Sequence, residues 1–232
     1  MDLIAEAITE AWRLLRTGDN DVYGITLRTA AITGTSTLVA LLVGLPIGLG
    51  LALARFPGQR SFVALANAGT GTPPVVAGLV VSILLWRSGP LGGLGLIYTP
   101  AAIILAQAVI ATPIIVAITA AAVMALPPAL HLQIRAMGAN QRQYLWLIVR
   151  EARLPLLVAV MAGFGAVVSE VGASMMVGGN LAGETRVLTT AAVLEVSKGQ
   201  FGSALALGFI LLAFIIVIAA VLTTVQQRAH RR

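Results

Sequence analysis

The sequence contains no cysteine, one lysine and nine acidic residues in a chain of 232. The lack of cysteine excludes disulfides and thiolate metal sites. The one lysine, Lys198, lies in "VSKGQ" and not in a GxxxxGK(S/T) pattern, so the chain cannot bind ATP through a phosphate loop. HExxH and GxSxG are absent too, and neither His131 nor His230 lies in a predicted span. We therefore predict a non-catalytic protein with no metal or cofactor site.

Apolar residues are what the chain has in excess. Of all residues 58% are hydrophobic and 10% charged, and the mean hydropathy is +0.95. A soluble domain cannot bury that much apolar surface, so we predict an integral membrane protein. A spanning helix needs about 20 apolar residues, and strand-like alternation is absent. The predicted fold is an all-α membrane bundle, a single domain of residues 1–232, with five transmembrane helices at 29–54, 61–86, within 98–125, 156–177 and 202–225.

The distribution of charge predicts the orientation of these spans. If the N-terminus is outside, the cytoplasmic segments hold nine arginines against one acid, Glu151, and the outer segments hold six bases against seven acids. The positive-inside rule thus favours an N-out, C-in topology. Anionic membrane lipid accounts for the net charge of +6, so no nucleic-acid partner is needed.

Two shorter stretches have helical patterns without the length to cross a membrane. Residues 2–17 ("DLIAEAITEAWRLLRT") place an apolar stripe opposite Glu6, Glu10 and Arg13. This pattern predicts an interfacial helix, which is either a membrane-surface anchor or a partner-binding element. Residues 184–201 are too short and too charged to span, and we expect an external interfacial or re-entrant helix there.

The second predicted span is interrupted by "NAGTGTPPVVAGL" at 67–79. Pro73 and Pro74 each remove a backbone donor, and a carbonyl freed in hydrocarbon must find a partner or face a watery cavity. We therefore predict a broken helix. Such a break either lines a transport pathway or is a packing kink against a neighbouring helix.

Glu170, in "SEVGASMMVGGN", is the only formal charge deep in a predicted span. An ionised carboxylate at mid-bilayer costs about 2.5 kcal/mol or more. Glu170 therefore either lies near a translocation pathway or is a hydrogen-bonded structural carboxyl. The candidate pathway residues, taken from the interrupted second span and from the stretch around Glu170, are Thr72, Pro73, Pro74, Ser169, Glu170 and Asn180.

The segment 126–155 is unusually polar for this chain and begins with the helix-breaking "LPP". Gly138 fits a helix C-terminus, and Asn140 with Gln143 resembles a capping box for a following helix that we expect to run to Pro155. The segment is interpreted as a cytoplasmic projection made of a short helix, a glycine hinge and a longer basic helix. It either docks a partner or is a basic loop lying on lipid.

Two motifs in this segment, "RAMGA" and "REARLP", resemble the cytoplasmic loop of ABC-importer permeases. Gly138 matches the glycine of that family's pattern, and Leu154 and Pro155 match its closing Leu-Pro. Leu132 stands where the family has glutamate, and the Leu-Pro comes about one helical turn later than usual. The motifs "NAGTGTPPVVAGL", "SGPLGGLGLIYTP", "SEVGASMMVGGN" and "TRVLTTAAVLEVSKGQF" extend the likeness over nearly the whole chain, and they are most similar to the tungstate permeases of this family, then to the molybdate permeases.

The resemblance implies a type I ABC-importer permease in a prokaryotic cell membrane. It implies a homodimer, two ATP-hydrolysing subunits inside and a substrate-binding protein outside. The residues that would couple to the ATPase are Arg135, Ala136, Met137, Gly138 and Ala139. The expected function is inward passage of an oxyanion, most simply tungstate and otherwise molybdate or sulfate, by alternating access. A secondary transporter or channel is expected to have more intramembrane ionisable residues than Glu170 alone, or an inverted repeat, and the sequence shows neither.

Overall fold

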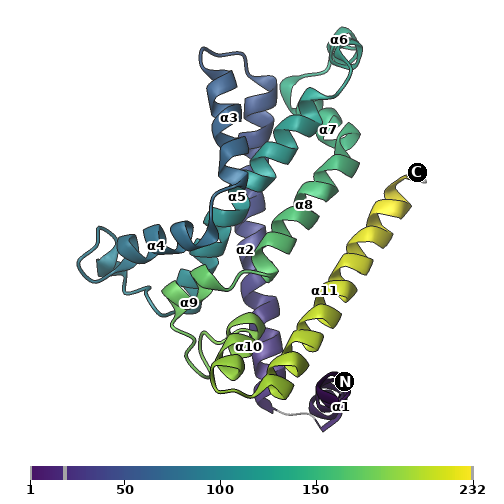
Figure 1. The fold of residues 1–232 in the computed structure, drawn as a ribbon. Coiled ribbons are helices and arrows are strands. Elements are labelled where there is room, and N and C mark those ends of the chain that lie inside the picture. Colours follow the sequence, from purple (N-terminus) through teal and green to yellow (C-terminus); the bar gives the residue numbers. More distant parts are fainter. Residues whose placement is uncertain (1, 18–19, 231–232) are drawn as a thin grey trace.

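The computed structural model of the protein describes residues 2–17 and 20–230, and every regular element in them is a helix. This confirms the predicted all-α class. Three helices are long and apolar enough to cross a membrane: α2 (Asn20–Leu53), α5 (Pro100–Met124) and α11 (Phe201–His230). Two further pairs of helices are sharply bent, and the number of candidate spans rises to five if each pair is one span. Figure 1 shows the long helices arranged as an elongated bundle.

Helix α2 begins nine residues before the predicted start at 29. The prediction stopped at Arg28 because a charge is costly in hydrocarbon. In the structure the Arg28 guanidinium donates to the carbonyl oxygens of Gly183 and Arg186, at 2.7 and 3.0 Å. The helix can therefore continue through the arginine, because a distant loop satisfies its donors.

Helices α2 and α5 form the centre of the bundle and approach each other closely. A Cβ atom placed on Gly48 would lie 2.6 Å from Cβ of Thr119. A buried chain of hydrogen bonds links the pair to a third helix. Ser36 Oγ donates to Gln107 Oε1 at 2.8 Å, and Gln107 Nε2 donates to Ser174 Oγ at 3.2 Å. Small residues and a few polar side chains thus hold these helices together, as is usual in a membrane, where the surrounding lipid is as apolar as the protein core.

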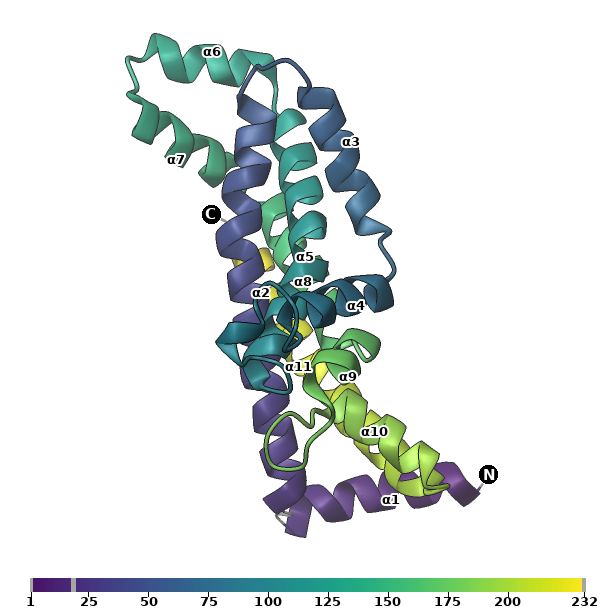
Figure 2. The same cartoon turned by 90° about the vertical axis from the view of Figure 1, so that its left-hand side faces the viewer.

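The second predicted span is broken, as predicted. It consists of α3 (Gln59–Thr70) and α4 (Pro74–Leu85), whose axes differ by 101°. Pro74 is the first residue of α4, a position where the missing N–H has no helical acceptor to lose. Helix α4 consequently leaves the direction of α3 and lies across the bundle (Figures 1 and 2). A loop with one 3-10 turn, η1 (Gly92–Leu94), returns the chain to α5.

The fourth predicted span, 156–177, is also broken, which the sequence reading missed. Helix α8 (Arg153–Val168) is separated from α9 (Gly172–Gly178) by residues 169–171. Glu170 therefore does not lie inside a continuous helix. It precedes the first turn of α9 and accepts a hydrogen bond from that turn, which gives the chain a reason to restart a helix here.

The two ends of the molecule carry different elements. Helix α1 (Asp2–Thr17) and α10 (Leu188–Ser197) lie at one end, and α6 (Pro128–Ala136) and α7 (Gln141–Glu151) at the other (Figures 1 and 2). Helix α1 runs across the direction of α2 and leaves Ile4, Ile8 and Trp12 exposed. This apolar stripe is what a helix lying in the membrane interface presents to lipid. The expected helix within 184–201 is present, but its first residues, 188–191, are buried in the bundle and do not lie on its surface.

Candidate functional site

The two helix breaks meet at one junction. A Cβ atom placed on Gly172, the first residue of α9, would lie 3.2 Å from Cγ2 of Val75 in the first turn of α4. One turn further along α4, a Cβ atom on Gly78 would lie 2.6 Å from the Cα of Ala173. The N-terminal ends of α4 and α9 are thus packed against each other, and so the breaks at 71–73 and 169–171 lie side by side.

Glu170 is part of the packing at this junction. Its side chain is buried, with 7% of its surface exposed, and its Oε1 accepts a hydrogen bond from the backbone N–H of Ala173 at 2.8 Å. Its backbone carbonyl accepts a hydrogen bond from the Thr189 hydroxyl at 3.1 Å, which ties the break to α10. A carboxylate capping the positive end of a helix is stabilised there. This geometry favours the structural interpretation of Glu170.

Two hydroxyls remain accessible beside the capped carboxylate. Thr72 is exposed, as are Pro73, the residue before α4, and Pro74, its first residue. Ser169 is exposed too, and its hydroxyl donates to the carbonyl of Gly165 in the last turn of α8 at 2.8 Å. The junction therefore presents hydroxyls and helix N-termini. Among the residues of the two breaks, 71–73 and 169–171, there is no basic side chain.

Asn180 is the one predicted pathway residue that lies away from the junction. It follows the C-terminal end of α9, so about 10 Å of helix separates it from Glu170 at 1.5 Å per residue. Its backbone φ is +54°, and its amide Nδ2 donates to the carbonyl of Thr190 at 3.3 Å. Asn180 therefore belongs to the loop between α9 and α10.

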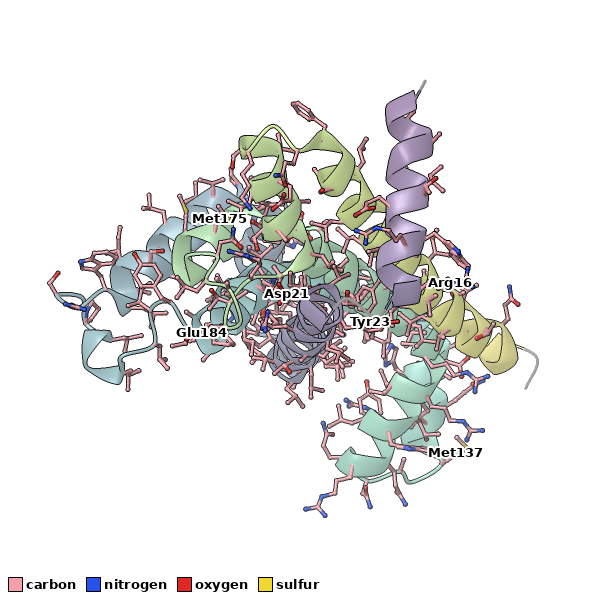
Figure 3. The ribbon with its side chains drawn as sticks, turned by 90° about the horizontal axis from the view of Figure 1, so that it is seen from below. Arg16, Asp21, Tyr23, Met137, Met175 and Glu184 are labelled. Carbon is pink, nitrogen blue, oxygen red and sulfur yellow. The ribbon has the colours of Figure 1, made fainter. Side chains whose placement is uncertain are left out.

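The segment 126–155, which contains the candidate coupling residues, begins with the helix, glycine turn and capping box that the sequence predicts. Gly138, with φ of +76°, ends the turn after α6. Asn140 Oδ1 accepts from the N–H of Gln143, and Gln143 Oε1 accepts from the N–H of Asn140, both at 2.9 Å, so the capping box is confirmed. Arg135, Ala136, Met137 and Gly138 are exposed and Ala139 is half-buried. Met137, 74% exposed, lies at the outer end of the helix pair in Figure 3.

Tyr144 holds the two helices of this segment together, a role that the sequence reading missed. The buried Tyr144 hydroxyl lies 2.8 Å from Nδ1 of His131, and the Arg135 guanidinium lies 5.1 Å from the centre of the tyrosine ring. Both partners belong to α6, so one α7 side chain fixes α6. The signal available in the sequence was an aromatic residue one turn after the capping box, with His131 and Arg135 spaced i, i+4 on the preceding helix.

The second helix of the segment ends earlier than expected. It was predicted to run to Pro155, but α7 ends at Glu151 and the chain bends by 70° into α8. A proline ring clashes with the carbonyl of the residue four positions earlier, which here is Glu151. Pro155 therefore lies in the first turn of the next helix, where backbone N–H groups lack helical acceptors in any case.

This bundle, with two broken helices on one side and a projecting helix pair at one end, has the fold of a type I ABC-importer permease. Its fold matches a chain of the solved structure described as "Inward facing conformations of the MetNI methionine ABC transporter" with a TM-score of 0.72. The match covers 94% of this chain and 98% of that one at 22% sequence identity.

Residues 44–231 match the family "Binding-protein-dependent transport system inner membrane component", and the chain belongs to this family. It is 36% identical to the "Tungstate uptake system permease protein TupB" of Peptoclostridium acidaminophilum, over 98% of this chain and all of the relative. It is 27% identical to the "Molybdenum transport system permease protein ModB" of Mycobacterium bovis, over 94% of this chain and 86% of the relative. The protein is thus the non-catalytic, multi-pass inner-membrane component of an ABC transporter that works with a separate ATPase and a substrate-binding protein.

Proposed function

We propose that this chain is the permease of an ATP-driven importer that passes tungstate inward. The observation that carries the proposal is the similarity to a tungstate permease over essentially the full length of both chains. The similarity to a molybdate permease makes that tetrahedral oxyanion the first alternative, and sulfate the next. The ions share shape and charge, so the same pathway chemistry serves all three.

The junction of the two breaks is the proposed pathway, lined by Thr72, Pro73, Pro74 and Ser169. Hydroxyls and N–H dipoles can replace part of the hydration of an oxyanion without binding it tightly. A fixed basic group at the same place would hold the ion and slow its release. The neighbouring Glu170 is engaged in capping α9, and we assign it a positioning role toward Ser169.

We further propose five spans, an N-out, C-in orientation and a dimer of this chain. The orientation is supported by the positions of α1 and of the arginine-rich α6–α7 pair at opposite ends (Figure 2). The second copy is supported by the exposure of Thr72 and Ser169, which leaves the junction open on one side. A partner copy placed against that side would complete a closed pathway from two identical halves.

The path from ATP hydrolysis to the junction follows the chain. In the proposed mechanism Arg135, Ala136, Met137, Gly138 and Ala139 dock on the ATPase, and Tyr144 transmits the movement of α6 to α7. The buried Ile148 and Ala152 pack in the same apolar cluster as Tyr144 and continue into α8. Helix α8 ends at the break that contains Ser169. Movement of the coupling segment therefore reaches the pathway through one helix.

The test is reconstitution of the permease with its own ATPase and binding protein in proteoliposomes. We expect tungstate to stimulate ATP hydrolysis and to accumulate inside only when ATP is present. The same measurements with molybdate and sulfate at equal concentration show which of the three oxyanions is the preferred substrate. Uptake of the oxyanion without ATP would instead indicate a channel or a secondary transporter. Failure of all three oxyanions to stimulate hydrolysis would refute an oxyanion substrate.

A further inference from the structure

The loop between α9 and α10, residues 179–187, is held against α2 in a specific way. Three of its residues have left-handed backbones: Gly179, Asn180 and Gly183, with φ of +69°, +54° and +79°. Arg28 of α2 donates to the carbonyl oxygens of Gly183 and Arg186 at 2.7 and 3.0 Å. The loop is therefore folded back on itself and fastened to α2 by one forked guanidinium.

A second contact fastens the end of the loop. The hydroxyl of Thr29, next to Arg28 on α2, accepts a hydrogen bond from the N–H of Leu188 at 2.9 Å. Leu188 is the first residue of α10, and α10 carries the Thr189 hydroxyl that binds the carbonyl of Glu170. Any displacement of the loop from α2 is thus transmitted to the break at 169–171.

The two arginines here lack an acidic partner. Among the side chains that the structure describes, Glu10–Arg13 and Glu195–Lys198 are ion pairs, and neither Arg28 nor Arg186 belongs to them. Arg186 donates from its NH2 group to the carbonyl of Asn180 at 3.3 Å, and its Nε is buried with no hydrogen-bond partner. The hydrogen bonds that the structure shows for both guanidinium groups therefore end on neutral carbonyl oxygens, and Arg186 Nε is buried without an acceptor.

Guanidinium groups form stronger hydrogen bonds with anions than with neutral acceptors. A bond from guanidinium to a carbonyl has one charged partner, whereas an oxyanion adds the attraction of a full opposite charge, and the planar fork of arginine matches two oxygens of a tetrahedral oxyanion. An oxyanion reaching this place would exchange favourably with the carbonyl oxygens of Gly183 and Arg186. The exchange would at the same time break the Arg28 contacts that hold residues 183–186 on α2, and the Thr29–Leu188 hydrogen bond would remain at the end of the loop.

We propose that Arg28 and Arg186 form an outer oxyanion-binding site, at which the arriving ion replaces the loop carbonyls and releases residues 179–187 from α2. This inference rests on the proposed function and on the N-out orientation, which places the loop at the end that faces the binding protein. It adds to the pathway a transient cationic site that the junction itself does not contain. The ion is attracted at the outer end and passed to the hydroxyl-lined junction.

The first test uses the reconstituted complex with saturating tungstate-loaded binding protein. Arg28→Gln and Arg186→Gln each remove one guanidinium, and Arg87→Gln removes an exposed arginine from the loop after α4 as a matched control. We expect tungstate uptake to fall about tenfold or more in the first two variants, since each loses charge-assisted bonds, and to stay near the wild-type rate in the control. Co-purification of the ATPase establishes that each variant is assembled. Arg28→Lys keeps the charge but loses the forked guanidinium, so its rate of tungstate uptake should lie between those of the wild type and Arg28→Gln.

The second test distinguishes anion binding from a structural clasp. Hydrogen exchange of the amides in 181–188 is measured on the wild-type complex without binding protein, in tungstate and in chloride of equal ionic strength. We expect faster exchange in tungstate for the wild type, and exchange that is fast in both salts for Arg28→Gln. Exchange that does not respond to tungstate in the wild type would overturn the proposal, even if uptake falls in the variants.

The outcomes also separate this inference from the proposed function. Normal tungstate uptake by Arg28→Gln and Arg186→Gln, alongside uptake by the wild type, refutes the outer site alone. A wild-type complex that transports none of the three oxyanions refutes the proposed function and, with it, the site.

Discussion

Replacing Gly138 distinguishes two free-energy costs: the backbone strain that a side chain causes within the permease, and the loss of binding energy if the residue docks on the ATPase. Its φ is +76°, and a Cβ atom placed on it would meet no atom within 4 Å. Within the permease itself, a side chain at this position therefore carries only the backbone penalty, about 1–2 kcal/mol for a left-handed conformation. Any larger loss must come from a partner that covers the residue.

Gly58 provides the matched control. It has φ of +87°, equally open surroundings, and a place in the loop between α2 and α3 at the same end of the molecule as α6 (Figure 1). Gly138→Glu and Gly58→Glu thus carry the same backbone penalty and the same added charge. If residues 135–139 dock on the ATPase, only the first variant also buries an unpaired carboxylate. That burial costs several kcal/mol, and about 3 kcal/mol weakens binding roughly a hundredfold.

The assay is the affinity of the ATPase subunit for each purified variant, measured together with substrate-stimulated ATP hydrolysis. We expect Gly138→Glu to insert in the membrane normally, to lose ATPase binding by about two orders of magnitude, and to lose stimulated hydrolysis. Gly138→Asn, which tolerates a left-handed backbone, should retain more binding than Gly138→Glu. Equal affinities for Gly138→Glu and Gly58→Glu would refute docking through the coupling residues and favour a basic loop lying on lipid.

Three further predictions concern the junction and the topology. Glu170→Gln keeps an oxygen for the Ala173 N–H and should preserve assembly and much of the transport, whereas Glu170→Leu should impair assembly. A Glu170→Gln variant that assembles normally but does not transport would show that the charge itself matters. Gly78→Ala places a methyl group 2.6 Å from a backbone atom of α9 and should lower the melting temperature of the detergent-solubilised permease. Gly165→Ala, whose methyl group meets no atom within 4 Å, should leave the melting temperature unchanged. Equal melting temperatures for the two variants would contradict the close packing of α4 on α9. Cysteine probes at Arg16 and Gln227 should label from opposite sides of the membrane, the former from outside, and labelling from one side only would exclude the five-span model.

The sequence predicts best those features that depend on nearby residues. Charge-free runs placed α5 and α11 to within a few residues, because hydrocarbon penalises any charge inside a span. The break before Pro74 and the capping box at Asn140 were also predicted, since proline and Asx side chains act on their own backbone. For the pathway residues, the sequence predicted the break before Pro74 and singled out Glu170, but only the structure revealed the second break, at 169–171, and placed it beside the first.

The features that were missed depend on contacts between distant residues. Helix α2 continues through Arg28 because carbonyl oxygens more than 150 positions later accept its hydrogen bonds. The break at 169–171 contains no proline, and it is stabilised by a side-chain cap and by Thr189 from the following helix. Local pattern could not have revealed these partners, because no spacing rule connects residues so far apart.

The buried hydrogen bonds of Gln107 have a consequence for how uniquely the bundle is assembled. Helices with small, apolar faces could slide along one another by one turn with little change in van der Waals contact. Such a slide would carry Gln107 away from Ser36 and Ser174 and leave an amide without partners in the apolar interior. A bond of this kind adds on average only about 0.6 kcal/mol to the stability of a membrane protein, but an unpaired amide costs about 2 kcal/mol or more. The three residues therefore contribute less to the depth of the native energy minimum than to its uniqueness, by selecting one register of α2, α5 and α9 over its shifted alternatives.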